Sequence, residues 1–580
     1  MLVISGGNNM NGCLIKDLKV LKKSSKEAVM GLEEMTEFKD YLHIKRNIEE
    51  DLLKKVKKSD KEDHSKLILV CGSVGDGKSH LLSIINNKYP KISKRFKFHN
   101  DATESRDPQK TFEDTLQDLL TPFNDNKYLK TNEKIILAIN LGTLHNFMKS
   151  KQSNNLSILK SYLKKKKLIN NYDVEINEKF DEYIEIVDFN EYEIFELEKN
   201  KLESYFIERL LKKITTKNEN NIIRKSYDNC CLNCKISDKC PVKYNYEIFL
   251  DDKFKNYISQ LIIKYIIKFK KIISVRGLLD FIFNIIVPNN LENIYNKKFD
   301  KIKKLAYNEK KFINYLSYNL IFNKKEVNNK FNKLNQIEPL NTRSYKIDLK
   351  YEKYRFDNKL KKDFKNNLDT KYIPLKTFLS EDYTIDEEVY NLLTKTIIRE
   401  IITRNFNLIE DKIYNDYIKK LYAQNISNNK KVLKDLYKKV ENAILNWNGV
   451  VDSRPKIFIG KKQEYYNYTK KIDISPDVKV FNGLDKYKFN KVLEISFENK
   501  KTDSKYEVNI DYKLYELIYK INGGYLPNKN DRDNHINYNE FVNKLIGKNA
   551  DEIYIHKMNS KKKFKLSEDS FDGYEFIEVK

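Results

Sequence analysis

The chain has 580 residues, of which 40% are hydrophobic and 33% are charged, a composition that is typical of a globular protein and excludes a largely disordered one. At about 100–200 residues per domain, this length predicts three to five domains. The formal net charge of +26 favours contact with polyanions such as nucleic acids, although A/T-rich coding would also enrich the chain in Lys, Asn, Ile and Tyr.

The predicted elements alternate between helix and strand over the first half of the chain. Residues 14–58 are predicted to be helical, and the apolar run 67–71 predicts a buried strand followed by a helix from Lys78. Further strands are expected at 95–99, 134–141 and 183–189, and helices at 110–120, 157–167 and 199–214. This alternation predicts a parallel sheet with helices on both faces.

The second half of the chain has two different patterns. Residues 291–450 are predicted to be mainly helical. Tyr506, Val508, Ile510 and Tyr512 alternate with polar residues, which predicts a half-buried strand whose hairpin partner is 492–497. Short strands are expected at 553–555, 564–566 and 574–579, so the last region is predicted to be α+β.

A glycine-rich loop joins the first predicted strand to its helix. It consists of Gly72, Ser73, Val74, Gly75, Asp76, Gly77, Lys78 and Ser79, with His80 next in the helix, and it matches the P-loop pattern G-x-x-x-x-G-K-S. The glycines let backbone N–H groups surround phosphate oxygens, Lys78 reaches the β- and γ-phosphates, and Ser79 ligates Mg²⁺. The sequence therefore predicts that the chain binds ATP with Mg²⁺.

Hydrolysis of a bound nucleotide also needs a carboxylate at the end of a neighbouring strand, where it holds Mg²⁺ and positions water. Near its end, the strand predicted at 134–141 has Asn140 where an aspartate is expected, and an amide is a poorer metal ligand. Asp101 and Asp188 follow two other strands and are the alternatives. We therefore expect hydrolysis that is slow or depends on a partner, with a non-hydrolysing scaffold as the alternative.

Two arginines are candidates for contact with the γ-phosphate. Arg276 begins a helix that follows the predicted sheet, which suits a lid residue, although a surface ion pair is nearly as good an explanation. Arg343 is a candidate arginine finger that would act in trans, but most arginines are simply solvated.

Four of the six cysteines fall in one short stretch. Cys231 and Cys234 form a C-x-x-C pair, Cys230 adjoins it, and Cys240 follows, which is a metal-ligand spacing and not a disulfide framework. Zinc is the first choice and an iron–sulfur cluster the second, with reduced, partly buried thiols as the alternative. Because adjacent cysteines rarely reach one ion together, a ligand from elsewhere in the chain is expected.

No predicted segment suits a membrane. Lysines interrupt the most apolar stretch, residues 261–275, so it does not provide the roughly 20 apolar residues that span a bilayer. We expect a cytoplasmic protein without membrane contact.

Seven pieces of the chain follow one another in a recognisable order: 24–29, the P-loop with His80 and Leu81, 99–105, 138–142, Cys240-Pro241 with Asn245-Tyr246, 339–343 and 523–528. Together they resemble the DptF family, whose members are components of bacterial DNA phosphorothioation-dependent restriction systems. The P-loop alone is specific; the order and spacing of the others carry the resemblance. The family is similar to this chain at Asn140 as well, where it also has Asn.

The resemblance implies an AAA-like P-loop protein that acts with DptG-like and DptH-like partners against DNA lacking the backbone sulfur. We expect an N-terminal helical segment at 1–58 and a P-loop domain at 59–290 with a cysteine-rich insertion at 228–246. A helical domain at 291–450 and an α+β domain at 451–580 would follow. The residues contain no nuclease motif, and no DNA-reading surface can be assigned from them.

Overall fold

The computed structural model describes most of the chain, and every structural statement below refers to the described residues. These are 13–26, 37–100, 109–125, 131–166, 168, 182–295, 309–323, 329–341, 344–356, 360–368, 371–378, 380, 386–405, 411–451, 455–460, 465–481, 484–499, 503–548, 552–558, 560, 562–568 and 573–579. The chain divides into two compact units, which we describe separately. Unit 1 comprises 1–195, 204–266 and 271–410, and unit 2 comprises 196–203, 267–270 and 411–580.

A four-stranded parallel sheet forms the centre of unit 1, with strand order β2-β3-β1-β4. Its strands are β1 (Lys66–Cys71), β2 (Lys97–His99), β3 (Lys134–Ile139) and β4 (Ile184–Asp188). Cys71, the last residue of β1, pairs with Ile139 of β3 on one side and with Asp188 of β4 on the other. The carboxyl ends of these three strands therefore lie next to one another.

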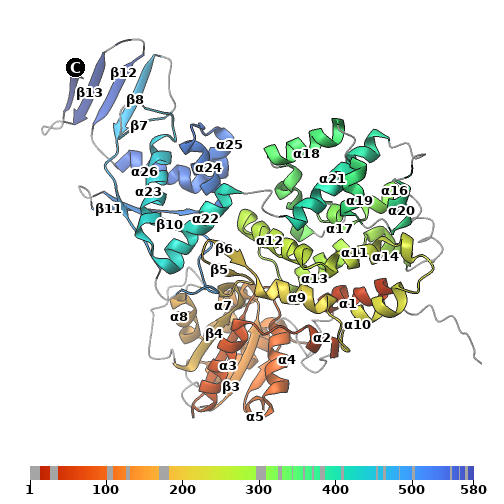
Figure 1. Ribbon diagram of the computed structural model, residues 1–580. Coiled ribbons are helices and arrows are strands. Elements are labelled where there is room, and N and C mark those ends of the chain that lie inside the picture. Colours follow the sequence, from red (N-terminus) through yellow and green to blue (C-terminus); the bar gives the residue numbers. More distant parts are fainter. Residues whose placement is uncertain are drawn as a thin grey trace, which may run out of the picture. The chain divides into compact units, whose positions relative to one another are not determined.

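Helices cover both faces of this sheet, as Figure 1 shows for α3, α4, α7 and α8. Because side chains alternate along a strand, Leu67 and Leu69 pack in a core with α6 (Phe112–Leu120), α7 (Leu141–Lys149) and α8 (Ser157–Lys165). Ile68 and Val70 pack on the other face with α3 (Asn47–Asp60) and α4 (Lys78–Lys88). The predicted parallel sheet with helices on both faces is thus confirmed.

The rest of unit 1 is helical. Its other helices are α1 (Leu14–Lys26), α2 (Glu37–Leu42), α5 (Pro90–Ser93), α9 (Tyr205–Thr215), α10 (Ile222–Ser226), α11 (Pro241–Leu250), α12 (Asp252–Phe269, whose last turn belongs to unit 2), α13 (Val275–Ile286), α14 (Asn289–Tyr295), α16 (Glu309–Asn314), α17 (Ser317–Leu320), α18 (Tyr345–Phe356), α19 (Leu360–Asn367), α20 (Ile373–Thr377) and α21 (Glu387–Arg404). A single π-helical turn, Tyr227–Cys231, continues α10.

Unit 2 combines helices with antiparallel sheets. Its helices are α22 (Lys412–Tyr422), α23 (Lys430–Leu445), α24 (Tyr512–Asn522), α25 (Lys529–Asn534) and α26 (Ile536–Lys548). One sheet has the order β11-β10-β9 and the other β14-β13-β12-β8-β7. The strands are β7 (Lys456–Phe458), β8 (Tyr466–Lys471), β9 (Ser475–Asp477), β10 (Leu493–Asn499), β11 (Ser504–Ile510), β12 (Ile553–Lys557), β13 (Lys563–Glu568) and β14 (Tyr574–Val579). The predicted hairpin of β10 with β11 and the three predicted C-terminal strands are confirmed.

Several predicted boundaries are wrong: for example, the strand predicted at 134–141 ends at Ile139, because Asn140 caps α7. Two further cases have clear local causes. The helix expected from residue 199 begins only at Tyr205, because β5 (Glu196–Glu198) and β6 (Lys201–Glu203) form a hairpin that turns at Asn200 with φ of 66°. Its Glu- and Lys-rich sequence resembles a helix, but Leu197 and Leu202 are buried. Tyr512 begins α24 instead of ending a strand, because Asp511 caps that helix by accepting a bond from the N–H of Leu514.

Candidate nucleotide-binding site

The loop between β1 and α4 has the backbone that its glycines predict. Gly75 and Gly77 have φ of 88° and 102°, in the left-handed region that glycine adopts without steric cost. A Cβ atom on Gly72 would lie 2.9 Å from the Cβ of Phe189, so this position also excludes a side chain. The loop therefore depends on glycine at three positions, each for a local steric reason.

Lys78 lies at the start of α4 and folds back into this loop. Its Nζ donates to the carbonyl oxygens of Gly72 at 3.0 Å and Ser73 at 2.8 Å. The buried carboxylate of Asp76 accepts a bond from the Ser73 N–H at 2.6 Å. Burial raises the pKa of Asp76, although Ser73, Lys78 and Arg46 oppose this effect. An ammonium group is thus held beside loop N–H groups and the N-terminus of α4, the arrangement that suits a phosphate.

Two of the predicted catalytic residues lie at the adjacent strand ends. Asp188 ends β4 directly beside Cys71, and Asn140 follows the last residue of β3. Both side chains also act locally, since Asp188 Oδ1 accepts from the N–H of Asn190 at 2.9 Å and Asn140 Oδ1 accepts from the N–H of Gly142 at 2.8 Å. Burial raises the pKa of Asp188. The structure therefore brings both residues to the edge of the sheet from which the loop emerges.

Asp101, the other carboxylate considered, lies outside the described residues. It follows β2, which β3 separates from β1. Asn100, the last described residue before it, has a buried Oδ1 atom without a hydrogen-bond partner in the described part of the chain. The Oδ1 atom of Asn100 thus lies without a partner among the described residues at the carboxyl end of β2, and the loop emerges from the same end of β1.

Arg276, the second residue of α13, is in direct contact with the loop. Its backbone N–H donates to the carbonyl of Gly75 at 3.4 Å, and a Cβ on Gly75 would lie 3.0 Å from the Cβ of Arg276. The Nε atom of Arg276 is buried and has no hydrogen-bond partner among the described residues. Arg276 therefore lies beside the loop, and its contact with a nucleotide stays a prediction, whereas Arg343 lies outside the described residues.

Two cationic residues at this site escaped the prediction from sequence. Arg46 precedes α3; its guanidinium lies 5.2 Å from the ring centroid of Phe189 and 5.4 Å from that of Phe206, and its Nη1 lies 3.4 Å from the carbonyl oxygen of Asp76. Desolvation lowers the pKa of Arg46 to about 10. Lys330 donates to Ser274 Oγ at 3.0 Å, at the N-cap of α13. Neither lies in a motif, so only the packing of distant segments reveals them.

His80 connects the loop helix to the segment between α2 and α3. Its Nε2 lies 3.1 Å from Nδ1 of His43, and Nε2 of His43 lies 3.1 Å from a carboxylate oxygen of Glu49. Burial lowers the pKa of His80 to about 4, and the charges of His43 and Lys39 act in the same direction while Glu49 and Asp40 oppose them. His80 is thus neutral at pH 7, and it connects α4 to Glu49 of α3 through His43.

We expect unit 1 to lose stability when the pH falls from about 6.5 towards 4. In this window the unfolded chain binds a proton at His80 and the folded chain does not, so the free energy of unfolding falls by about 1–2 kcal/mol by pH 5. Urea denaturation at pH 7 and pH 5 measures this loss. In His80→Gln the loss should shrink by that amount; an unchanged pH dependence would contradict the assignment.

The cysteine segment lies between α10 and α11. Cys230 and Cys231 end the π-helical turn, Cys240 is the N-cap of α11, and all six cysteines are free thiols. In the described part of the chain, no three His, Cys, Asp or Glu side chains are placed so that they could already hold a metal ion. The zinc or iron–sulfur assignment therefore stays a prediction.

Comparisons of the chain with models of protein families, with curated proteins and with solved structures find no match. A search of the described residues finds no helix with the length and apolar character needed to cross a membrane.

Proposed function

We propose that this chain binds ATP with Mg²⁺ through Gly72–Ser79 and that its parallel sheet is that of an AAA-like P-loop NTPase. The observation that carries this proposal is the position of the Lys78 ammonium group, inside a loop that depends on Gly75 and Gly77 and leads into α4. Backbone N–H groups, a helix N-terminus and one cation together bind a polyphosphate.

The surroundings of the loop support a reaction centre as well as a binding site. Asp188 offers a carboxylate at the end of a neighbouring strand, which suits a ligand of Mg²⁺ held directly or through water. The buried Nε of Arg276 beside Gly75 suits contact with the γ-phosphate. We propose hydrolysis at this site, slow or dependent on a partner.

A second candidate function is a nucleotide-stabilised scaffold that does not hydrolyse ATP. One observation favours it: the side-chain oxygen of Asn140, at the position where a catalytic carboxylate is expected, already caps α7. The two functions differ in turnover and not in binding. Hydrolysis measured with and without DNA and partner subunits separates them.

We expect Asp188→Asn to weaken the effect of Mg²⁺ on ATP binding about tenfold, which corresponds to about 1.4 kcal/mol. The amide keeps the size of the side chain and a bond to Asn190 but lacks the charge that Mg²⁺ prefers. Calorimetric titration of ATP with and without Mg²⁺ measures this effect.

The matched variant for this experiment is Asp101→Asn, at the end of β2. If Asp101→Asn loses the Mg²⁺ effect and Asp188→Asn keeps it, the metal ligand belongs to β2 and the role of Asp188 is confined to capping.

We further propose that the chain is the ATP-binding subunit of a bacterial DNA phosphorothioation-dependent restriction complex, with DptG-like and DptH-like partners. The resemblance in sequence and the net charge of +26 support this. Restriction of unmodified phage DNA in cells that express the complete system tests it. If cells with Lys78→Ala are protected as fully as cells with the wild type, an ATP-driven role in restriction is wrong.

A further inference from the structure

Five of the six cysteines gather in one part of unit 1. Cys13 directly precedes α1, which packs against α10, against the π-helical turn and against α11. The pKa of Cys13 is raised to about 12, mostly by burial and in smaller part by the thiols of Cys240, Cys234 and Cys230. The pKa of Cys231 is raised too, mostly by burial and in smaller part by Cys240 and Cys13. The fold therefore brings the N-terminal cysteine, far away in sequence, within electrostatic range of the cysteine segment.

Two of these thiols lie at helix N-termini, where backbone N–H groups favour a thiolate. The N–H groups of Val242 and Lys243 face the thiol of Cys240, the N-cap of α11, and the N–H of Ile15 faces the thiol of Cys13. Donors of this kind surround metal-bound cysteine sulfur and stabilise its negative charge. Both sulfur atoms therefore lie where backbone donors would also support a thiolate bound to a metal ion.

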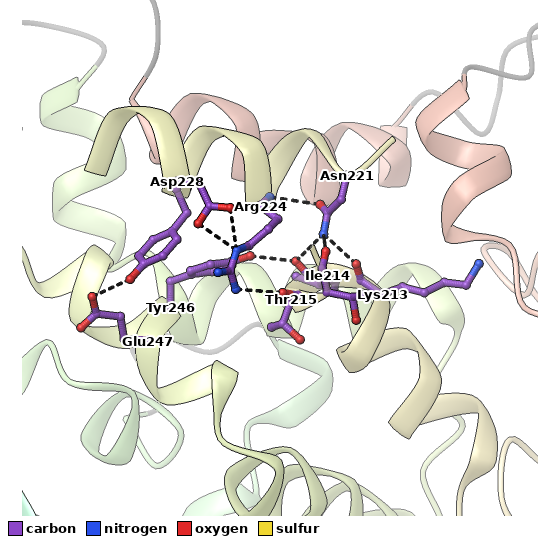
Figure 2. A network of polar contacts seen from close by, with 10 residues as sticks. Lys213, Ile214, Thr215, Asn221, Arg224, Asp228, Tyr246 and Glu247 are labelled. Atoms are coloured by element: carbon purple, nitrogen blue, oxygen red, sulfur yellow. Dashed lines mark hydrogen bonds and ion pairs between the residues drawn. The ribbon is translucent and has the colours of Figure 1, made fainter. Parts of the chain in front are cut away.

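The backbone that carries the cysteine segment is held in place by polar contacts on the side of α9 and α11 (Figure 2). Asn221 donates to the carbonyl oxygens of Lys213 at 2.9 Å and Ile214 at 3.1 Å, and Arg224 pairs with Asp228 at 3.0 Å. In addition, the hydroxyl of Tyr246 donates to the carbonyl of Ile214 at 2.9 Å, and that of Tyr227 donates to Glu247 at 2.7 Å. These contacts fix the turn that ends in Cys230 and Cys231 without using a thiol.

We propose that Cys13, Cys231, Cys234 and Cys240 bind one Zn²⁺ ion in a tetrahedral site that ties α1 to the segment between α10 and α11. Four thiolates are a common ligand set for structural zinc, and Cys231 and Cys234 have the usual C-x-x-C spacing. In the described residues these thiols interact electrostatically with one another but are not arranged as metal ligands, so side-chain rotation has to complete the site.

Cys231 is assigned in preference to Cys230 for two reasons. Adjacent cysteines rarely reach one ion together, and of the two only Cys231 is buried. Cys230 therefore provides a matched control: it has the same chemistry and is the immediate neighbour in the chain, but it is not a ligand.

The test uses the full chain, purified under reducing conditions, with elemental analysis and Co²⁺ substitution. We expect about one zinc ion per chain, and thiolate-to-cobalt charge-transfer absorption typical of a tetrahedral thiolate site. Cys13→Ser should lower zinc affinity at least about tenfold and weaken the cobalt absorption, while Cys230→Ser should change neither.

Three results would overturn the proposal. These are a wild-type chain that binds no zinc, a Cys13→Ser chain with unchanged zinc affinity, or an iron–sulfur absorption spectrum in place of zinc. Circular dichroism shows whether Cys13→Ser still folds. If it does not, Cys230→Ser decides: an unchanged four-thiolate cobalt spectrum in that variant leaves Cys13 as the fourth thiolate, and a weakened spectrum overturns the assignment. ATP binding by the P-loop is a separate measurement and does not depend on this outcome.

Discussion

Replacing Lys78 with alanine is expected to lower the affinity for ATP about a hundredfold. The ammonium group would leave the carbonyl oxygens of Gly72 and Ser73 to bond the phosphates, and charge-assisted bonds of this kind contribute about 3 kcal/mol together. Backbone N–H groups and the N-terminus of α4 remain in the variant, so weak binding should persist. Calorimetric titration with ATP and Mg²⁺ measures the difference.

Lys88→Ala is the matched control for this prediction. Lys88 is an exposed residue at the other end of the same helix, so its replacement removes the same charge without touching the loop. It should bind ATP as the wild type does. If the wild type itself shows no affinity for any nucleoside triphosphate, with or without Mg²⁺, the proposed function is wrong; if Lys78→Ala and wild type bind equally, Lys78 is not a phosphate ligand.

Replacing Arg46 with alanine is expected to lower the free energy of unfolding of unit 1 by about 3 kcal/mol. The substitution removes two cation–ring contacts, with Phe189 and Phe206, and leaves the buried carboxylate of Asp76 without one of the charges that favour its ionised form. Since Asp76 holds the Ser73 N–H, ATP affinity should fall as well. Urea denaturation monitored by circular dichroism, followed by calorimetry, measures both effects.

The neighbouring residue offers the control for Arg46. Lys45 is exposed and pairs with Glu50 at the surface, so Lys45→Ala should leave stability and ATP affinity unchanged. Arg46→Lys keeps the charge but cannot stack a planar guanidinium on the rings, and an intermediate loss is expected. Equal stability of Arg46→Ala and Lys45→Ala would show that Arg46 does not support the loop.

Local sequence was sufficient for the loop and for most of the sheet. The apolar run before Gly72 predicts β1, and the glycine pattern predicts a backbone that Gly75 and Gly77 adopt with positive φ. Short-range chemistry also predicts the β10–β11 hairpin, through the alternation at Tyr506, Val508 and Ile510. Local sequence was misleading at β5 and β6. The Glu and Lys residues there favour a helix, but the segment forms a hairpin that buries Leu197 and Leu202.

The order of the strands in the parallel sheet follows from tertiary structure and not from local sequence. Sequence placed Asn140, Asp188 and Asp101 at strand ends without ranking their distances from the loop. The register of β1 with β4 puts Asp188 directly beside Cys71, and β3 separates β2 from β1. Which carboxylate is the nearest to the loop thus depends on pairing between strands that are far apart in the chain.

By itself, the sequence determined the glycine-rich loop between β1 and α4, because turn geometry, helix start and lysine all lie within eight consecutive residues. The tertiary structure alone brought Arg46 to that loop, His43 to His80, and Cys13 towards the other cysteines. The physical reason is that these contacts arise from the burial of apolar faces on different helices, and no local pattern encodes which faces meet.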